Sequence, residues 1–352
     1  MEKKELEFII DKLEKKSGLK IEEYLALVEG YSPQLAQYAA KKAVRVRQQI
    51  YGNKIFIRGL IEISNICKND CYYCGIRKSN HNCNRYRLTK EEILKCCSQG
   101  YELGFRTFVL QGGEEGFFSD ENLCDIVSEI REKFPDCAIT LSLGERTKES
   151  YRKLFYAGAN RYLLRHETAD KKHYEQLHPK EMSFENRMQC LKNLKEIGYQ
   201  TGCGFMVNSP FQTAKTLAKD LKFIEEMKPE MCGIGPFIPH KDTLFKEERA
   251  GDVDFTCYLI SLLRLMHPTI LLPATTALNS LDEKGREKGI LAGANVVMPN
   301  LSPADARKKY ELYNNKANSG VEAVEGLEDL KRRMIDISYE VVCDRGDIVK
   351  IL

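Results

Sequence analysis

The chain has 352 residues, of which 43% are hydrophobic and 30% are charged, as is ordinary for a soluble globular protein. Its 54 basic and 51 acidic residues give a formal net charge of +3, which excludes the strongly basic surface expected of a nucleic-acid-binding protein. No apolar run is long enough to cross a membrane, and residues 1–16 lack the apolar core of an export signal. The 13 cysteines therefore indicate a reducing, cytoplasmic location rather than disulfides.

Residues 1 to about 54 predict helices, because apolar residues such as Ile9, Ile10 and Leu13 recur at helical spacing. From residue 55 onward, short apolar runs alternate with amphipathic stretches. The predicted strands are 55–64, 107–113, 138–144, 161–168, 202–207, 232–239, 269–275 and 294–299. The predicted helices between them include 89–104, 121–134, 183–198 and 214–227.

Eight strands that alternate with helices predict parallel pairing and an α/β fold, a complete (β/α)8 TIM barrel. An open, doubly wound sheet is the alternative that the same alternation permits. We expect a helical segment at 1–54 packed on a barrel at 55–305, followed by a C-terminal extension at 306–352, all in one structural unit.

Polar residues gather where the predicted strands end, at 111–114, 165–167, 239–240, 275–276 and 299–300. The carboxyl ends of the strands form the catalytic face of a barrel, so we expect the functional site there. His166 and His240 belong to this face, but neither has the spacing of a metal ligand. We expect both to serve as hydrogen-bonding residues.

Three cysteines follow the first predicted strand in a Cys-x3-Cys-x2-Cys pattern: Cys67, Cys71 and Cys74. Three thiolates can hold three irons of a [4Fe-4S] cluster and leave the fourth iron open to a small molecule. Structural zinc is the alternative, but it takes four ligands, and the sequence contains no second Cys-x2-Cys or His pair. Most of the other cysteines lie in apolar patterns and are expected to be small buried hydrophobic residues.

The stretch CKNDCYYCG, with Tyr73 directly before the third cysteine, resembles the signature of radical S-adenosylmethionine (SAM) enzymes. The stretch QGGEE at 111–115 resembles the GGE motif of the same superfamily. The resemblance implies that Cys67, Cys71 and Cys74 hold the catalytic cluster and that Gln111, Gly113 and Glu114 lie against SAM. It also implies one-electron cleavage of SAM to methionine and a 5′-deoxyadenosyl radical.

Further stretches resemble the HydE family of radical SAM maturases, whose relatives are methylornithine synthase and biotin synthase. They are TLSLGE, RYLLRHETAD, SFENR, GIGPFIPH, PATTAL and GANVVMPN. The resemblance implies a role in assembling the active-site cluster of [FeFe]-hydrogenase from a cysteine-derived iron carbonyl cyanide precursor. It implies HydG and HydF as maturation partners and an external electron donor. The alternatives are a HydE-like paralogue, a carbon-skeleton mutase of the methylornithine-synthase type, or a non-catalytic metal-binding protein.

In the HydE pattern, the residues that bind SAM correspond here to Arg165, Glu167 and Arg187. An arginine can clamp the carboxylate of SAM, and a glutamate can accept hydrogen bonds from ribose hydroxyls or the ammonium group. The alternative for Arg165 and Glu167 is a structural ion pair in the barrel wall.

The resemblance also implies a set of substrate residues inside the barrel, namely Thr140, Arg161, Thr275, Thr276, Met298 and Tyr310. Hydroxyl groups and arginine suit small anions or the carboxylate of a cysteine-derived ligand. Met298 has the alternative of a place in the core.

Two departures from the family pattern stand out. The family usually has MVGLPGQT after strand five, whereas this chain has MVNSPFQT at 206–213, so we expect a changed rim around SAM or substrate. Only Cys343 follows Cys257, so we expect no accessory cluster.

Overall fold

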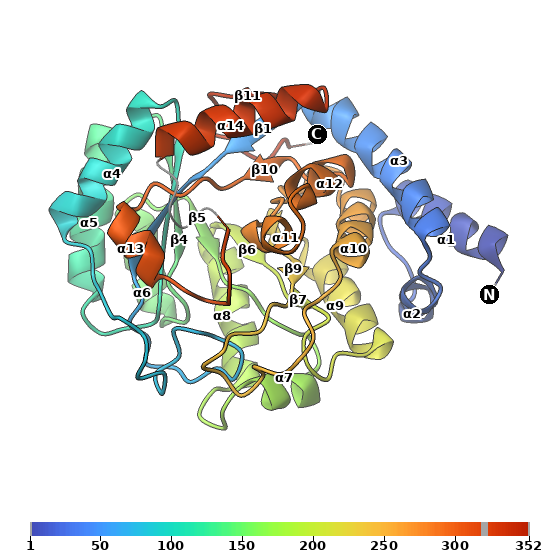
Figure 1. Cartoon of the computed structure of the whole chain (residues 1–352), viewed down its shortest axis with the longest axis horizontal. Coiled ribbons are helices and arrows are strands. Elements are labelled where there is room, and N and C mark those ends of the chain that lie inside the picture. The colour runs from blue at the N-terminus through green and yellow to red at the C-terminus, as the bar shows by residue number, and fades with distance from the viewer. Residues whose placement is uncertain (1, 318–322, 351–352) are drawn as a thin grey trace.

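Parallel strands form a ring at the centre of the structure, and helices surround it (Figure 1). The computed structural model describes residues 2–317 and 323–350. The strands are β1 (Lys54–Ile57), β2 (Gly59–Ser64), β3 (Thr107–Gly112), β4 (Ala138–Ser142), β5 (Arg161–Leu163), β6 (Gln200–Cys203), β7 (Met206–Val207), β8 (Met231–Cys232), β9 (Gly235–Pro236), β10 (Val296–Val297) and β11 (Glu340–Val342). The helices are α1 (Lys3–Lys16), α2 (Ile21–Glu29), α3 (Pro33–Tyr51), α4 (Lys90–Glu102), α5 (Asp120–Lys133), α6 (Lys148–Tyr156), α7 (Lys171–Leu177), α8 (Phe184–Ile197), α9 (Ala214–Met227), α10 (Val253–Met266), α11 (Thr276–Leu281), α12 (Gly285–Leu291), α13 (Ala304–Lys309) and α14 (Ala323–Asp336).

The ring is closed. Six strands form one parallel sheet in the order β2-β3-β4-β5-β6-β8. Single parallel bridges continue around the ring, joining Met231 to Leu271, Pro273 to Val296, and Asn300 back to Leu60 of β2. This closure confirms the predicted (β/α)8 barrel and excludes the open doubly wound sheet.

The predicted first strand, 55–64, is two strands in the structure. β1 pairs with β10 on one side and with β11 on the other, whereas β2 joins the barrel sheet. The break falls at Arg58, whose buried side chain donates to Met231 Sδ at 2.9 Å. The C-terminal extension therefore adds a parallel strand, β11, that the sequence pattern did not predict.

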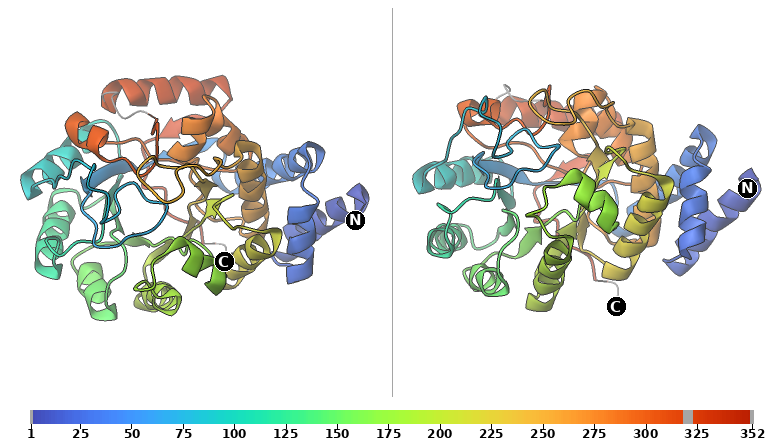
Figure 2. Two further views of the ribbon diagram at one scale, coloured as in Figure 1. Left: turned by 60° about the horizontal axis from the view of Figure 1, so that its bottom comes forward. Right: turned by 90° about the horizontal axis from the view of Figure 1, so that it is seen from below.

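Helices α1, α2 and α3 lie against the outside of the barrel, on the right in Figure 1 and in both views of Figure 2. α3 packs along α10, and α2 packs along α9. The backbone N–H of Leu19 and the hydroxyl of Tyr24 both donate to the Glu225 carboxylate of α9, at 2.9 and 2.7 Å. These bonds tie the N-terminal helices to the barrel.

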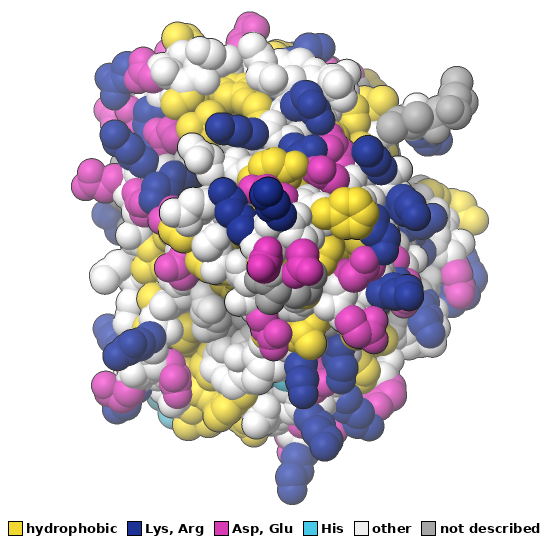
Figure 3. All heavy atoms as spheres, turned by 90° about the vertical axis from the view of Figure 1, so that its right-hand side faces the viewer, with side chains coloured by type: hydrophobic (Ala, Val, Ile, Leu, Met, Phe, Trp, Pro, Cys, Tyr) yellow, Lys and Arg dark blue, Asp and Glu magenta, His cyan; other side chains and the backbone are white. Residues whose placement is uncertain are grey.

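Basic and acidic side chains alternate over the face seen from the side of these helices (Figure 3). This mixture agrees with the small net charge of the chain. Within residues 2–317 and 323–350, no helix combines the length and apolar character that a membrane span requires.

Hydroxyl caps set the starts of the two helices that matter most for the site. Ser183 Oγ accepts the N–H of Asn186 at the start of α8, and Thr213 Oγ1 accepts that of Thr216 at the start of α9. α8 thereby places Arg187 in its first turn, and α9 buries Asp220.

Candidate active site

The loop between β2 and α4 carries Cys67, Cys71 and Cys74, all partly buried. Burial raises the pKa of the Cys71 thiol, and the neighbouring thiols of Cys74 and Cys67 raise it further. Burial, with the nearby Cys67, raises the pKa of Cys74 to about 12. Cys71 therefore lies near both of the other two cysteines of the pattern.

In the described part of the chain, no three His, Cys, Asp or Glu side chains converge on one point as around a single metal ion. A [4Fe-4S] cluster makes a different demand, because each cysteine binds a separate iron. A loop that carries several thiols around a small space suits that demand.

The backbone after β3 lies directly against the first part of the cysteine loop. The N–H of Lys68 donates to the Glu114 carbonyl at 2.7 Å. A Cβ at Gly113 would lie 2.2 Å from the Ile66 carbonyl oxygen and 2.8 Å from Cys67 Cβ, so only glycine fits here. The predicted GGE motif and the predicted cluster loop are thus in direct contact.

The Glu114 side chain makes two contacts, and in one of them its Oε2 lies 3.6 Å from Nζ of Lys68 in the cysteine loop. Its Oε1 accepts the N–H of Glu145 at 2.9 Å, which ties the end of β3 to the end of β4. Gln111, the other polar residue of the motif, donates from Nε2 to Tyr310 Oη at 3.3 Å. The predicted SAM motif is thus joined to one predicted substrate residue.

Arg165, Glu167 and Arg187 meet beside the cysteine loop. Arg187 is buried, and it donates from Nε to Glu145 at 2.5 Å and from Nη1 to the Arg165 carbonyl at 2.7 Å. Arg165 Nη2 lies 3.2 Å from Glu167 Oε2. The charges of Arg187 and Glu167 both act on the thiol of Cys71, which places the three residues near the loop.

This ion pair is incompletely satisfied. Arg165 Nε, Arg165 Nη2 and Glu167 Oε2 are buried and make no hydrogen bond to any described residue. Buried polar atoms are normally paired, so such a set marks the place of a polar ligand. The site therefore fits a molecule with both a carboxylate and hydrogen-bond donors, as SAM has.

An apolar cluster lies next to the same loop. Tyr72 and Tyr73 pack against buried Leu177, Met206, Phe237 and Phe245. His178 Nδ1 donates to the Tyr174 carbonyl at 2.9 Å, so its Nε2 accepts from Tyr73 Oη at 3.1 Å. This cluster was not predicted, although the two adjacent tyrosines of the CYYC stretch indicated an aromatic surface beside the cysteines.

Two of the predicted substrate threonines have unmet hydroxyl groups. Thr140 Oγ1 on β4 and Thr275 Oγ1 before α11 are buried without a hydrogen-bond partner among the described residues. Thr276 begins α11, next to Thr275. Met298 is partly buried and packs against the small core cluster that contains Met231 and Val296. This packing agrees with the alternative that Met298 belongs to the core.

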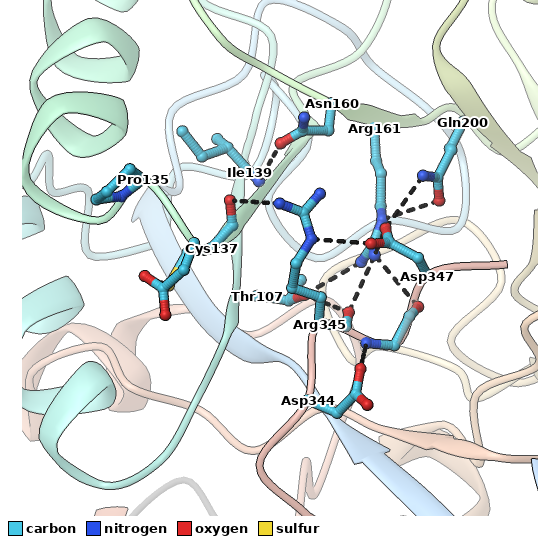
Figure 4. Close-up of polar contacts among 12 residues, drawn as sticks. Thr107, Pro135, Cys137, Ile139, Asn160, Arg161, Gln200, Asp344, Arg345 and Asp347 are labelled. Carbon is cyan, nitrogen blue, oxygen red and sulfur yellow. Dashed lines mark hydrogen bonds and ion pairs between the residues drawn. The ribbon is translucent and has the colours of Figure 1, made fainter.

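Arg161 lies in a different place from the other predicted substrate residues, and this prediction is corrected. Arg161 begins β5 and is fully buried. Its guanidinium donates to Gln200, to Thr107, to the Arg345 and Gly346 carbonyls and to Asp347 (Figure 4). All three guanidinium nitrogens thus have protein partners at the amino-terminal end of the strands, where the C-terminal segment crosses the barrel. Arg161 therefore anchors that segment, whereas Arg165, just beyond β5 in the chain, has two buried nitrogens without a hydrogen bond to a described residue.

A buried charged pair inside the barrel was also missed. Glu62 of β2 is 1% exposed, and its carboxylate accepts from Lys316 and, at 2.8 Å, from Asn300 Nδ2. Burial raises the pKa of Glu62, although Lys316 and Asn300 oppose the rise. Lys316 Nζ also donates to the Tyr310 carbonyl at 3.1 Å. A charged residue within the apolar run at 59–64 was the signal that could have revealed Glu62.

The MVNSPFQT departure keeps a backbone that suits glycine. Asn208 and Phe211 have positive φ angles of 56° and 64°. Asn208 Oδ1 accepts the N–H of Asp252 at 3.0 Å, whereas the Phe211 ring is 54% exposed and meets Phe245 edge to face. The added phenyl group thus lies at the surface of the barrel mouth.

Comparisons with known proteins found similar chains. Residues 61–224 match the family model described as the radical SAM superfamily. The chain is 45% identical over 276 residues to the [FeFe] hydrogenase maturase subunit HydE of Thermotoga maritima, covering 78% of each chain. It is 29% identical to 3-methylornithine synthase of Methanosarcina acetivorans, over 77% of this chain and 75% of that protein.

Solved structures show the same fold. The crystal structure of methylornithine synthase (PylB) superposes with a TM-score of 0.82 at 26% identity, covering 95% of this chain and 97% of that one. The crystal structure of HydG, a maturase of the [FeFe]-hydrogenase, gives a TM-score of 0.80 at 21% identity, covering 96% of this chain and 76% of that one.

Proposed function

The chain belongs to the HydE family of radical SAM enzymes, and from that premise we propose that it acts in assembling the active-site cluster of an [FeFe]-hydrogenase. The observation that carries the proposal is the 45% identity to a HydE maturase over 78% of both chains. The local geometry supports it, because the unsatisfied Arg165–Glu167 pair lies beside the three cysteines.

Membership in this superfamily implies a [4Fe-4S] cluster and SAM as cofactors. Bound together, they supply a one-electron reductive cleavage that gives methionine and a 5′-deoxyadenosyl radical. The chain contributes the ligands, the orientation of SAM and a space that excludes water.

Cys67, Cys71 and Cys74 are the proposed iron ligands. Their burial disfavours free thiolates, since it raises the pKa of each thiol. Iron binding offsets that cost, because a metal stabilises the deprotonated form. The absence of a side chain at Gly113 lets the backbone after β3 lie directly against Cys67.

Arg165, Glu167 and Arg187 are the proposed SAM residues. Arg165 has the unmet donors that a carboxylate needs, and Glu167 has the unmet acceptor that ribose hydroxyls or an ammonium group need. Arg187 is held by Glu145 and holds the Arg165 carbonyl in turn, so it acts as a support. The apolar cluster beside Tyr72 and Tyr73 offers a flat surface to the nucleobase.

The proposed substrate site lies deeper, inside the closed barrel. The unmet hydroxyls of Thr140 and Thr275 are donors for a small polar substrate, with Thr276 and Tyr310 as further wall residues and Met298 at the boundary between this wall and the core cluster of Met231 and Val296. A cysteine-derived iron carbonyl cyanide species is the substrate class that the family resemblance supports. The closed wall protects a radical from water and from other hydrogen donors.

The proposed partners are HydG as the source of the substrate, HydF as the acceptor of the product, and a separate electron donor, in the cytoplasm. A likeness in fold to HydG is compatible with two maturases of common ancestry that act in sequence. The balanced surface charge gives no support to nucleic acid as a partner.

In vitro activation of apo-hydrogenase tests this function. Purified apo-hydrogenase is incubated anaerobically with HydG, HydF, SAM, reductant and this protein, and hydrogen evolution is measured. We expect activation that depends on this protein and that the Cys71→Ala variant does not support. Absence of activation, together with methylornithine formed from lysine by the same preparation, would contradict the proposal. That result would favour a carbon-skeleton mutase of the methylornithine-synthase type.

A further inference from the structure

A buried histidine–aspartate pair lies behind the Arg165–Glu167 pair. His166 and Asp220 are both fully buried, and His166 Nε2 lies 3.5 Å from Asp220 Oδ1. The imidazole is packed between the rings of Phe205 and Phe223, with centroids 5.8 and 4.7 Å away. His166 lies against Asp220 of α9, whereas Arg165 and Glu167 pair with each other beside the cysteine loop.

The hydrogen bonds of the imidazole define its orientation. The Gly204 N–H donates to His166 Nδ1 at 3.3 Å, so Nδ1 is the acceptor and the proton is on Nε2. The Nε2–H group therefore faces the carboxylate of Asp220. The pair links the exit of β6 to the buried side of α9.

The same carboxylate oxygen also holds the other flank of Glu167. Asp220 Oδ1 accepts the N–H of Ala169 at 2.5 Å. Asp220 thus contacts the side chain of His166, which precedes Glu167, and the backbone of Ala169, which follows it by two residues.

Glu167 itself has a strained backbone. Its φ angle is +65°, in the left-handed region that residues other than glycine rarely adopt. Its N–H donates to the Gly204 carbonyl at 3.0 Å, so the strand beside it also contributes to holding it. Such a conformation persists only where the surroundings determine it, and it is common at ligand sites.

We propose that Asp220 and His166 are positioning residues that hold Glu167 in its left-handed conformation and so set the affinity for SAM without touching it. The inference rests on the proposed role of Glu167 in SAM binding. The competing explanation is a buried pair that only stabilises the fold. The two explanations differ in whether the effect passes through Glu167.

A double-mutant cycle separates them. The dissociation constant of SAM is measured anaerobically by calorimetry on cluster-loaded protein, for wild type, Asp220→Asn, Glu167→Gln and the double variant. We expect Asp220→Asn to raise the constant about tenfold in the wild-type background and less than about twofold in the Glu167→Gln background. Iron content and cluster absorbance should stay unchanged.

Glu225→Gln provides a matched control on the same helix. Glu225 also accepts a backbone N–H and a side-chain donor, but it ties α9 to Leu19 and Tyr24 rather than to the site. We expect this variant to lose thermal stability and to keep the wild-type affinity for SAM. If Asp220→Asn does not fold, His166→Gln replaces it in the cycle, because it leaves the Asp220–Ala169 bond in place.

The outcomes distinguish this inference from the function on which it rests. If wild-type protein with a full cluster does not bind SAM, the proposed function fails. If wild type binds SAM and the Asp220 or His166 variant binds it equally well, or loses the same factor in both backgrounds, the positioning role is overturned.

Discussion

Arg165 Nη2 lies 3.2 Å from Glu167 Oε2, yet both atoms are buried without a hydrogen bond to any residue in 2–317 or 323–350. Each unmet buried polar atom costs about 1–3 kcal/mol. A ligand that supplies the missing partners therefore gains affinity from a pair that the fold holds ready. This relationship is the basis of the proposed SAM site beside the cysteine loop.

The first prediction concerns that pair. Glu167→Gln should raise the dissociation constant of SAM about ten- to hundredfold, because a hydrogen bond to a charged group contributes about 1.5–3 kcal/mol. Calorimetry on cluster-loaded protein measures the change. The control is Glu149→Gln on α6, an exposed glutamate with a 62% exposed side chain, which should bind SAM as wild type does. Equal affinity of the Glu167 and Glu149 variants would remove Glu167 from the SAM site.

The second prediction compares two cysteines of the same loop region. After anaerobic reconstitution, wild type should hold about four irons per chain, and Cys71→Ala should lose the cluster. Cys83→Ala should keep it, because Cys83 contacts Asn65 at 3.5 Å and lies outside the three-cysteine pattern. Iron and sulfide analysis with absorbance measures both variants. Loss of the cluster in Cys83→Ala, with retention in Cys71→Ala, would reverse the ligand assignment.

The parts of the fold that depend on local pattern were predictable from the sequence. The alternation of strands and helices predicted the barrel. The shared cluster site of Cys67, Cys71 and Cys74 stays a prediction. Contacts between distant segments were not predictable. Asp347 and Arg161 are 186 residues apart in the sequence, and Lys316 and Glu62 are 254 residues apart. Local sequence periodicity cannot predict contacts between segments so far apart. Arg161 was assigned to the substrate, although it binds Thr107, Gln200 and the C-terminal extension.

The third prediction separates stability from function inside the barrel. Thr140 Oγ1 is buried without a partner in the described structure, so Thr140→Val should leave the free energy of unfolding unchanged or raise it by up to about 1 kcal/mol. The same variant should lower hydrogenase activation, because it removes a donor from the proposed substrate site. Denaturant unfolding and the activation assay measure the two effects. A destabilised variant with full activity would show that Thr140 serves the fold alone.

The fourth prediction concerns the C-terminal anchor. Burial by itself raises the pKa of Asp347, but the charge and hydrogen bond of Arg161 outweigh it and lower the pKa to about 2 from the ordinary 3.8. Because the pKa of Asp347 is lower in the folded state than in the unfolded state, its ionised carboxylate stabilises the folded state at pH values above about 4. This stabilisation is lost as the pH falls from about 4 to about 2. Wild type should therefore lose melting temperature across that window more steeply than Asp347→Asn.

Melting curves at several pH values measure this difference. The control is Asp254→Asn, because Asp254 has a 65% exposed side chain on α10. It should keep the wild-type slope. Parallel slopes for wild type and Asp347→Asn would show that the Arg161–Asp347 pair does not contribute to acid stability.

The most direct test of the central claim is the amount of 5′-deoxyadenosine released by reconstituted protein with SAM and a strong reductant under strict exclusion of oxygen. The account predicts at least about one equivalent per loaded cluster from wild type, release that depends on the reductant, and none above background from Cys71→Ala. Release that is absent from wild type with a full cluster, or equal in the Cys71→Ala protein, would contradict it.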